Sequence, residues 1–234
     1  RNFLFFMEKI IKAITLYSTK QTIMTTENNI ATITSLEYKE YFDNGINYAK
    51  YKEQMADELV TNSDTKIKEY IALNQHRMRR VEKTFAISDT LNQEIENLKN
   101  KTYWLVLTEH WCGDASQTIP ALHKIEAASK GKLEMKLVYR DQNLKLMDQY
   151  LTNNGRSIPK LIQMDSNYNV TGVWGPRPAI AQKLVNELKS NPATADNYAN
   201  ELHLWYAKDK QKSLEIEISE LVLQSNLLHV DCLS

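Results

Sequence analysis

The sequence has few cysteines, no excess of charge of either sign and no long apolar run. Two cysteines, Cys112 and Cys232, are too few for the disulfide framework of a small secreted protein. Lys plus Arg and Asp plus Glu number 29 each, so net charge favours neither nucleic acid nor anionic membrane. The apolar run of residues 3–7 is far shorter than the roughly 20 residues of a membrane-spanning helix. We therefore expect a cytoplasmic protein, in a reducing compartment, with no nucleic-acid or membrane partner.

The composition is otherwise that of a folded protein. Of its 234 residues, 42% are hydrophobic and 25% are charged, which is enough apolar material for a sizeable core. The first residues lack the clean apolar stretch of a secretory signal, and Met24 resembles a natural start. We expect residues 1–33 to form an N-terminal extension outside the fold.

Residues 34–87 are predicted to form a helical extension that packs on the core. Thr34 and Glu37 have the spacing of a capping box, and apolar residues at helical intervals continue this first helix to Leu59. A second helix is expected to begin near Asn62 to Asp64, after which apolar residues recur at steps of four and three. Its basic residues, from His76 to Lys83, are expected to be the solvated face.

Residues 88–190 have the pattern of an α/β core. After a short helix capped by Ser88, the apolar run Tyr103 to Leu107 predicts a strand that is buried on both faces. The later elements are expected to be a helix at 114–129, a strand at 133–140, a helix at 144–153 capped by Gly155, strands at 160–164 and 170–174, and a helix at 178–190. This order predicts a sheet with helices on both faces. Residues 191–234 are expected to form a helical C-terminal extension.

The residues with the clearest chemical potential lie between the first strand and the helix that follows it. At this position the sulfur of Cys112 would lie near the positive end of a helix dipole and near unpaired N–H groups, which favour thiolate. A structural cysteine buried as a small apolar residue is the alternative. Asp114 is expected to cap the helix, but its charge would oppose thiolate formation, and the sequence leaves that balance open.

This segment resembles the thioredoxin family. Trp111-Cys112-Gly113 matches the family's Trp-Cys-Gly, and Pro120 falls where the family kinks its active-site helix. Ile158-Pro159 falls where the family places a cis-proline loop opposite the cysteine. The resemblance covers about residues 88–190 and implies a thioredoxin fold, with a central mixed sheet and helices on both faces. It also implies a cis bond before Pro159 and a substrate groove walled by this loop and Trp111.

Two departures from the family limit what the resemblance implies. Ala115 stands where the family has its second, resolving cysteine, and Val106 and Leu137 stand where it has a buried proton-handling pair. The resemblance therefore implies exchange with one thiol. Cys112 would attack a protein or small-thiol disulfide, and an external thiol such as glutathione would release it, with no cofactor. The alternative is a redox-silent module that docks a peptide or protein partner in the groove.

Other polar residues are secondary candidates. Glu109 and His110 could tune Cys112, and Arg156 and Lys160 could meet the carboxylate of a thiol substrate, although each could simply be solvated. The sequence has no paired ligands at metal-binding spacing, so no metal is expected. Cys232 is expected to be an incidental tail thiol without a disulfide to Cys112.

Overall fold

The computed structural model describes residues 32–227. The chain divides into two units, residues 1–32 and 33–234, and the description concerns the second. The expectations for residues 1–31 and for Cys232 lie outside the described residues. The N-terminal helices of this unit are α2 (Ser35–Asn44), α3 (Tyr48–Thr61), α4 (Thr65–Thr84) and α5 (Asp89–Glu96). None of the described helices is long and apolar enough to cross a membrane.

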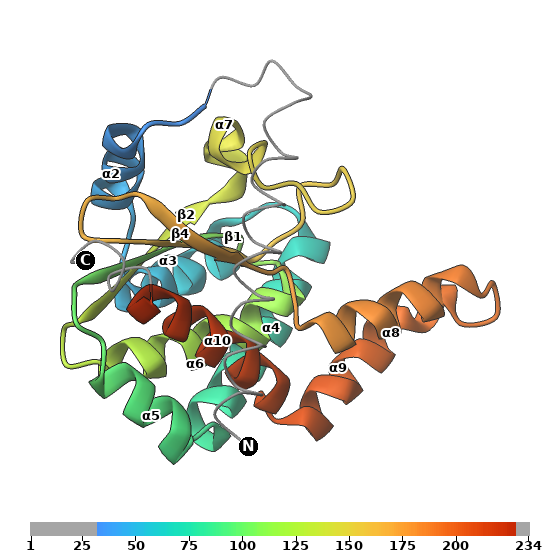
Figure 1. Cartoon of the computed structure of the whole chain (residues 1–234). Helices are drawn as coiled ribbons and strands as arrows, with labels where there is room; N and C mark the ends of the chain where they lie inside the picture. Colours follow the sequence, from blue (N-terminus) through green and yellow to red (C-terminus); the bar gives the residue numbers. More distant parts are fainter. Residues whose placement is uncertain (1–31, 228–234) are drawn as a thin grey trace, which may run out of the picture. The chain divides into compact units, whose positions relative to one another are not determined.

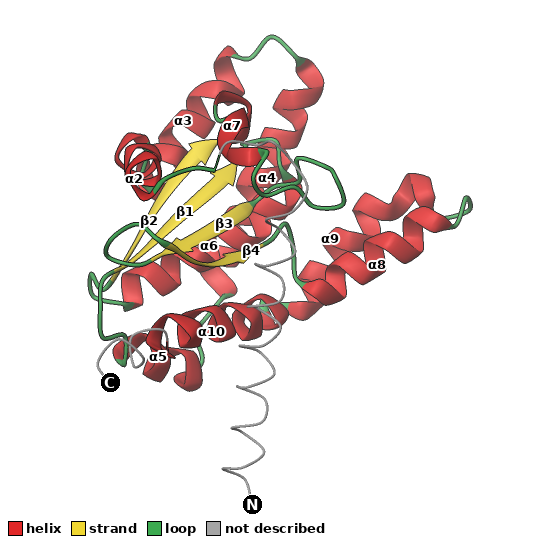
Figure 2. Ribbon diagram, turned by 45° about the horizontal axis from the view of Figure 1, so that its top comes forward, coloured by secondary structure: helices red, strands yellow, loops and turns green. Residues whose placement is uncertain are grey.

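A mixed four-stranded sheet forms the centre of this unit, with helices on both faces (Figure 1, Figure 2). Its strands are β1 (Thr102–Thr108), β2 (Leu133–Tyr139), β3 (Lys160–Met164) and β4 (Val170–Trp174). They lie in the order β2-β1-β3-β4, with β1 parallel to β2 and antiparallel to β3. Helix α6 (Gly113–Ala128) connects β1 to β2 and packs against α4.

Strand β1 is buried because it has apolar residues on both faces. Trp104, Leu105, Val106 and Leu107 have no exposed surface, as expected for a central strand covered on both sides. Val106 lies directly beside Leu137 of β2, which is also buried. Val106 and Leu137, which stand where the family has its buried proton-handling pair, are therefore neighbours in the core. Because both are apolar, no buried charge is left without a partner.

The predicted helix from Thr34 to Leu59 is interrupted, and the interruption protects an edge of the sheet. Ile46 forms two backbone hydrogen bonds with Leu137, of 2.9 and 2.8 Å, on the outer edge of β2. Gly45 allows this approach, because a Cβ there would lie 2.8 Å from the Cβ of Lys136. Asn47 then caps α3 by accepting the N–H of Lys50. Covering the edge in this way prevents pairing with another chain.

The helix predicted from Leu144 to Asn153 is also shorter than expected. Helix α7 (Leu144–Met147) ends after four residues, and Gly155 is not a left-handed cap. Instead, Thr152 and Gly155 pair across Asn153 and Asn154, which have φ of 51° and 61°. Asparagine tolerates positive φ, so this dipeptide makes a tight turn where the pattern predicted a helix end.

The C-terminal helices are α8 (Ala179–Ser190), α9 (Tyr198–Asp209) and α10 (Lys212–Leu227). Helices α8 and α9 lie side by side as a hairpin (Figure 1, Figure 2) that has a small apolar core of its own, formed by Ala181, Val185, Leu202 and Tyr206. The chain then turns at Lys210 and Gln211, both at positive φ, and α10 packs along β4 and α5. The predicted helical tail is thus two helices with separate packing partners.

Candidate active site

Cys112 lies at the start of α6 and faces the proline loop. It is the residue before the first turn, its side chain is 6% exposed, and its thiol donates a hydrogen bond of 3.3 Å to the carbonyl oxygen of Ile158. The peptide bond between Ile158 and Pro159 is cis. The cysteine and the proline loop, 46 residues apart in sequence, therefore form one site.

Burial disfavours ionisation of the Cys112 thiol. Loss of solvation is the largest cause, and the negative charge of Asp114 adds to it, so the pKa is raised from 9.0 to about 12. The backbone N–H groups of Ala115 and Asp114 and the charge of Arg177 act in the opposite direction. The helix terminus thus stabilises thiolate as expected, but burial outweighs it in this conformation.

Asp114 is not a helix cap, contrary to expectation, because its carboxylate points to a different partner. Arg177 donates two hydrogen bonds to it, of 2.6 and 3.1 Å, and the hydroxyl of Tyr206 donates a third of 2.7 Å. The carboxylate and the guanidinium are both largely buried. Losing one partner would leave the other as a buried, unpaired charge, which is costly.

Helix α9 covers the motif directly. A Cβ added to Gly113 would lie 2.8 Å from Nε2 of His203, so a larger residue there would require the His203 side chain to shift. Nδ1 of the same histidine lies 3.1 Å from Nε2 of Gln117. Ala115, at the place of the missing second thiol, is buried in the core. The hairpin of α8 and α9 therefore forms one wall of the site.

Comparison with known proteins agrees with this geometry. A family model described as Thioredoxin matches residues 60–189, more than half of the chain. The chain belongs to the thioredoxin family. The matched region begins within α3 and so includes α4 as well as the α/β core.

The solved structures that resemble this thioredoxin-family chain are too different in sequence to indicate more than its fold. A protein of unknown function from Pseudomonas aeruginosa has a TM-score of 0.54 at 17% identity, over 79% of this chain and 96% of the other. An HIV epitope-scaffold has a TM-score of 0.47 at 20% identity, over 76% of this chain and 97% of the other. No curated protein matches the sequence.

Glu109 and His110 flank the thioredoxin-like motif but are bonded elsewhere. Glu109 accepts the backbone N–H of Asp141 at 2.9 Å. The two nitrogens of His110 lie 2.5 Å from Glu58 and 2.9 Å from the hydroxyl of Tyr139. Burial lowers the pKa of this histidine, against the charge of Glu58. Their hydrogen bonds hold the loop before Cys112, and neither side chain bonds to the thiol.

Arg156 and Lys160, the expected contacts for a substrate carboxylate, are both engaged within the chain. Arg156 donates two hydrogen bonds to Asp148, of 2.7 and 2.9 Å. Lys160 is 5% exposed, and its ammonium donates to the hydroxyl of Thr152 and to the carbonyl of Gly175. Burial lowers the pKa of Lys160 to about 8. In this conformation they support the proline loop.

A second cis bond, between Gly175 and Pro176, adjoins this loop and was not predicted. Gly175 has φ of 114°, and a Cβ there would lie 2.3 Å from the carbonyl oxygen of Pro159. Glycine is therefore required both by its backbone conformation and by the close contact. This turn leads directly to Arg177 and so positions the partner of Asp114.

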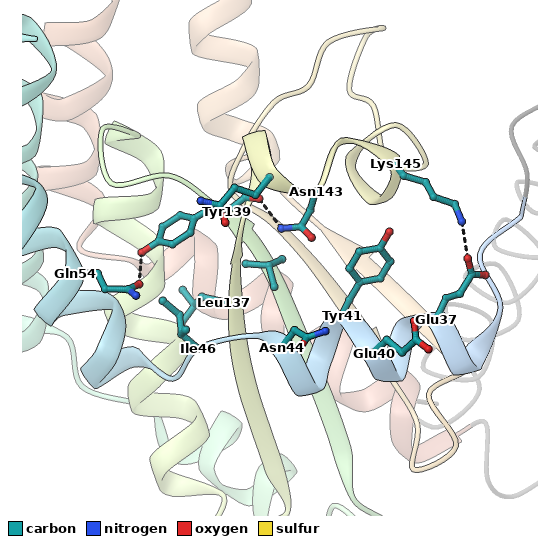
Figure 3. Close-up of a pocket in the computed structure, with 12 residues that line it drawn as sticks. Glu37, Glu40, Tyr41, Asn44, Ile46, Gln54, Leu137, Tyr139, Asn143 and Lys145 are labelled. Atoms are coloured by element: carbon teal, nitrogen blue, oxygen red, sulfur yellow. Dashed lines mark hydrogen bonds and ion pairs between the residues drawn. The ribbon is translucent and has the colours of Figure 1, made fainter. Parts of the chain in front are cut away.

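A cavity of about 560 Å³ lies beside β2, away from Cys112 (Figure 3). Tyr139 lines it and donates to Gln54, while Lys145 pairs with Glu37 at its other end. A neighbouring cavity of about 310 Å³ shares Gln54 and Tyr139 and reaches Glu109 and His110. None of the four residues from Trp111 to Asp114 lines either cavity. Among the described residues, no three His, Cys, Asp or Glu side chains are placed to hold a metal ion.

Sequence reasoning missed Arg177, His203 and Tyr206. None of the three was given a role in the site. The nearest of the three, Arg177, is 63 residues from Asp114 in sequence, so no local pattern connects them. Arg77 and Arg80 were assigned to the solvated face of α4, yet both are half-buried beside the motif. Their spacing of three on one helix face was the available signal.

Proposed function

We propose that this protein carries out thiol–disulfide exchange with Cys112 as its single reacting thiol. The observation that carries the proposal is the position of Cys112 Sγ, at the start of α6 and 3.3 Å from the carbonyl oxygen before the cis-proline. Trp111, half-buried beneath the guanidinium of Arg140, would form a wall of the substrate groove. We place the protein in a reducing compartment such as the cytoplasm, where thiols are kept reduced.

The exchange takes place in two balanced steps. The Cys112 thiolate attacks one sulfur of a protein or small-thiol disulfide, whose S–S bond breaks and releases the other sulfur as a thiolate that takes up a proton. The resulting mixed disulfide is then attacked by an external thiol such as glutathione, and Cys112 leaves as thiolate. Because Ala115 replaces the second cysteine, the neighbouring turn cannot complete this second step.

The high pKa of Cys112 sets the speed of the first step. Because burial raises the pKa of the thiol to about 12, only a very small fraction of it is ionised at neutral pH in this conformation. Reaction therefore depends on relief of burial when a substrate enters or α9 moves. The same burial favours a second candidate function, a redox-silent module that docks a peptide or protein partner against the proline loop.

Turnover distinguishes the two functions. We expect the protein to accelerate the reduction of hydroxyethyl disulfide by glutathione, with the Cys112→Ser variant inactive and the Cys232→Ser variant fully active. Equal rates for the natural protein and the Cys112→Ser variant would instead support the binding module.

A further inference from the structure

Four cationic or titratable side chains lie at the start of α6, next to the reacting cysteine. Arg77 and His203 approach Gly113, whereas Arg80 bonds to Gln117 and Arg177 bonds to Asp114. Arg77 and Arg80 come from α4, Arg177 precedes α8, and His203 comes from α9. Nη1 of Arg77 lies 3.7 Å from the position that a Cβ of Gly113 would occupy, and Nε2 of His203 lies 2.8 Å from it. Two separate elements, α4 and the turn before α8, thus bring positive charge to the start of α6, and α9 adds the imidazole of His203.

The charges of this group do not balance. Arg177 is neutralised by Asp114, the only carboxylate that Arg177 bonds. Arg77 and Arg80 donate to the neutral amide oxygens of Asn74 and Gln117, at 2.7 and 2.6 Å. Among the described residues, neither has a carboxylate within ion-pair distance. The charge of Asp114 acts on Arg77 and opposes the lowering of its pKa, but Asp114 is already bonded to Arg177. Among the described residues, Arg77 and Arg80 thus have no bonded counter-charge of their own next to the motif.

Neighbouring groups respond to this excess charge. The pKa of His203 is lowered to about 4, first by burial and then by Arg77, Arg80 and Arg177, so the imidazole is neutral. The pKa of Arg77 is also lowered, by burial and by Arg80. Partly desolvated like charges repel each other, and a bound anion would offset that repulsion.

We propose that Arg77 and Arg80 form an anion-recognition site that selects thiols and disulfides with a carboxylate close to the reacting sulfur. This inference rests on the proposed exchange by Cys112 and names its substrate class. Guanidinium groups suit the task because their planar N–H pairs match the two oxygens of a carboxylate. The site replaces Arg156 and Lys160 in this role, since Arg156 is already paired with the carboxylate of Asp148 and Lys160 is buried with hydrogen bonds to Thr152 and Gly175.

Helix α4 supplies a matched control. Arg79 lies between the two arginines in sequence but is exposed, and its guanidinium bonds to His76. Arg79→Gln removes the same charge from the same helix without changing the group at the start of α6. The double variant Arg77→Lys with Arg80→Lys keeps the positive charge, whereas Arg77→Gln with Arg80→Gln removes it.

The test compares three small disulfides of different charge. Dithiodipropionate is a dianion, hydroxyethyl disulfide is neutral and cystamine is a dication. Their reaction rates with Cys112 are measured on a Cys232→Ser background, and each is divided by its rate with the urea-unfolded chain to remove intrinsic reactivity. We expect the glutamine double variant to lose at least about tenfold in the ratio of dianion to dication rates, while Arg79→Gln changes it less than twofold. Added salt should reduce the preference in the natural protein.

A binding measurement makes the outcome independent of reactivity. On a Cys112→Ser, Cys232→Ser background, dithiodipropionate should raise Tm and hydroxyethyl disulfide should not. The Tm increase should disappear in the glutamine double variant and persist in the lysine variant. Unchanged rate ratios together with an unchanged Tm increase in the glutamine variant would overturn the anion site. Failure of Cys112 to react with any disulfide, with the Tm increase intact, would overturn the exchange function alone.

Discussion

Asp114 connects Cys112, the cysteine proposed to react, to the rest of the candidate site. Its charge raises the pKa of the Cys112 thiol, and the same carboxylate holds Arg177, whose charge lowers it. The two influences oppose each other at the sulfur, so burial is the main cause of the high pKa. The residue also fixes Tyr206 of α9 and so joins the motif to the hairpin.

Replacing Asp114 should therefore affect both reactivity and stability. In Asp114→Asn the Cys112 thiol loses a nearby negative charge, so its pKa should fall below about 12. Arg177 would remain buried without a counter-charge, and the free energy of unfolding should drop by about 3–5 kcal/mol. The pH dependence of iodoacetamide alkylation and urea unfolding measure the two effects. Asp148→Asn, which breaks the exposed pair with Arg156, is the control and should leave alkylation unchanged.

A second thiol at position 115 should change the mechanism from exchange with one thiol to exchange with two. Ala115→Cys places two cysteines one helical turn apart, and we expect a reversible internal disulfide with Cys112. Ala115 is 1% exposed, so the larger side chain should cost about 1–3 kcal/mol of stability. Ala115→Ser is the matched control for volume. Thiol counting and protein-disulfide reduction by a dithiol reductant measure the change. A folded variant in which neither cysteine reacts would show that the thiol is not activated.

The hairpin of α8 and α9 contacts the site through polar groups. Its apolar core lies between its own two helices, while its contacts with the motif are made by the polar groups of Arg177, His203 and Tyr206. A contact made by a titratable side chain such as His203 weakens when its protonation state changes, whereas apolar packing does not depend on pH. The attachment of α9 should therefore be pH-sensitive.

Acid should loosen α9. The pKa of His203 is lowered from 6.5 to about 4 by burial and by Arg77, Arg80 and Arg177. A lowered folded-state pKa means that the unfolded chain binds the proton more tightly. The stability from this group is complete above pH 6.5 and is lost as the pH falls towards 4. Hydrogen exchange of α9 amides should accelerate across this window relative to β1, and His203→Gln should remove the dependence. An equal acceleration in His203→Gln would assign it to other groups.

At the scale of the whole molecule, the features that could be predicted were those that depend on local pattern. The buried β1 follows from five consecutive apolar residues, and α4 begins at the expected place, with Asp64 as its cap. The break at Gly45 could not be predicted, because it depends on a pairing of Ile46 with Leu137 that forms only in the folded sheet.

In the site, too, local patterns could be predicted, whereas contacts between distant segments could not. Cys112 and the proline loop could be located because a short motif and two prolines identify a familiar arrangement. The environment that controls the thiol could not, because Arg177 and Tyr206 reach Asp114 from 63 and 92 residues away. Burial of Cys112 is likewise a property of the assembled hairpin and core. The sequence weighs the helix terminus against the charge of Asp114 and leaves the balance open, because the burial that decides it depends on the folded chain.

The covalent intermediate at Cys112 is the most direct test of the account. Folded protein is exposed to hydroxyethyl disulfide, and the mass of the peptide containing Cys112 is measured before and after addition of glutathione. We predict a mixed disulfide on Cys112 that disappears when glutathione is added, with the Cys112→Ser variant unmodified in the same peptide. An adduct that forms in urea-unfolded protein but never in the folded chain would contradict the proposed exchange.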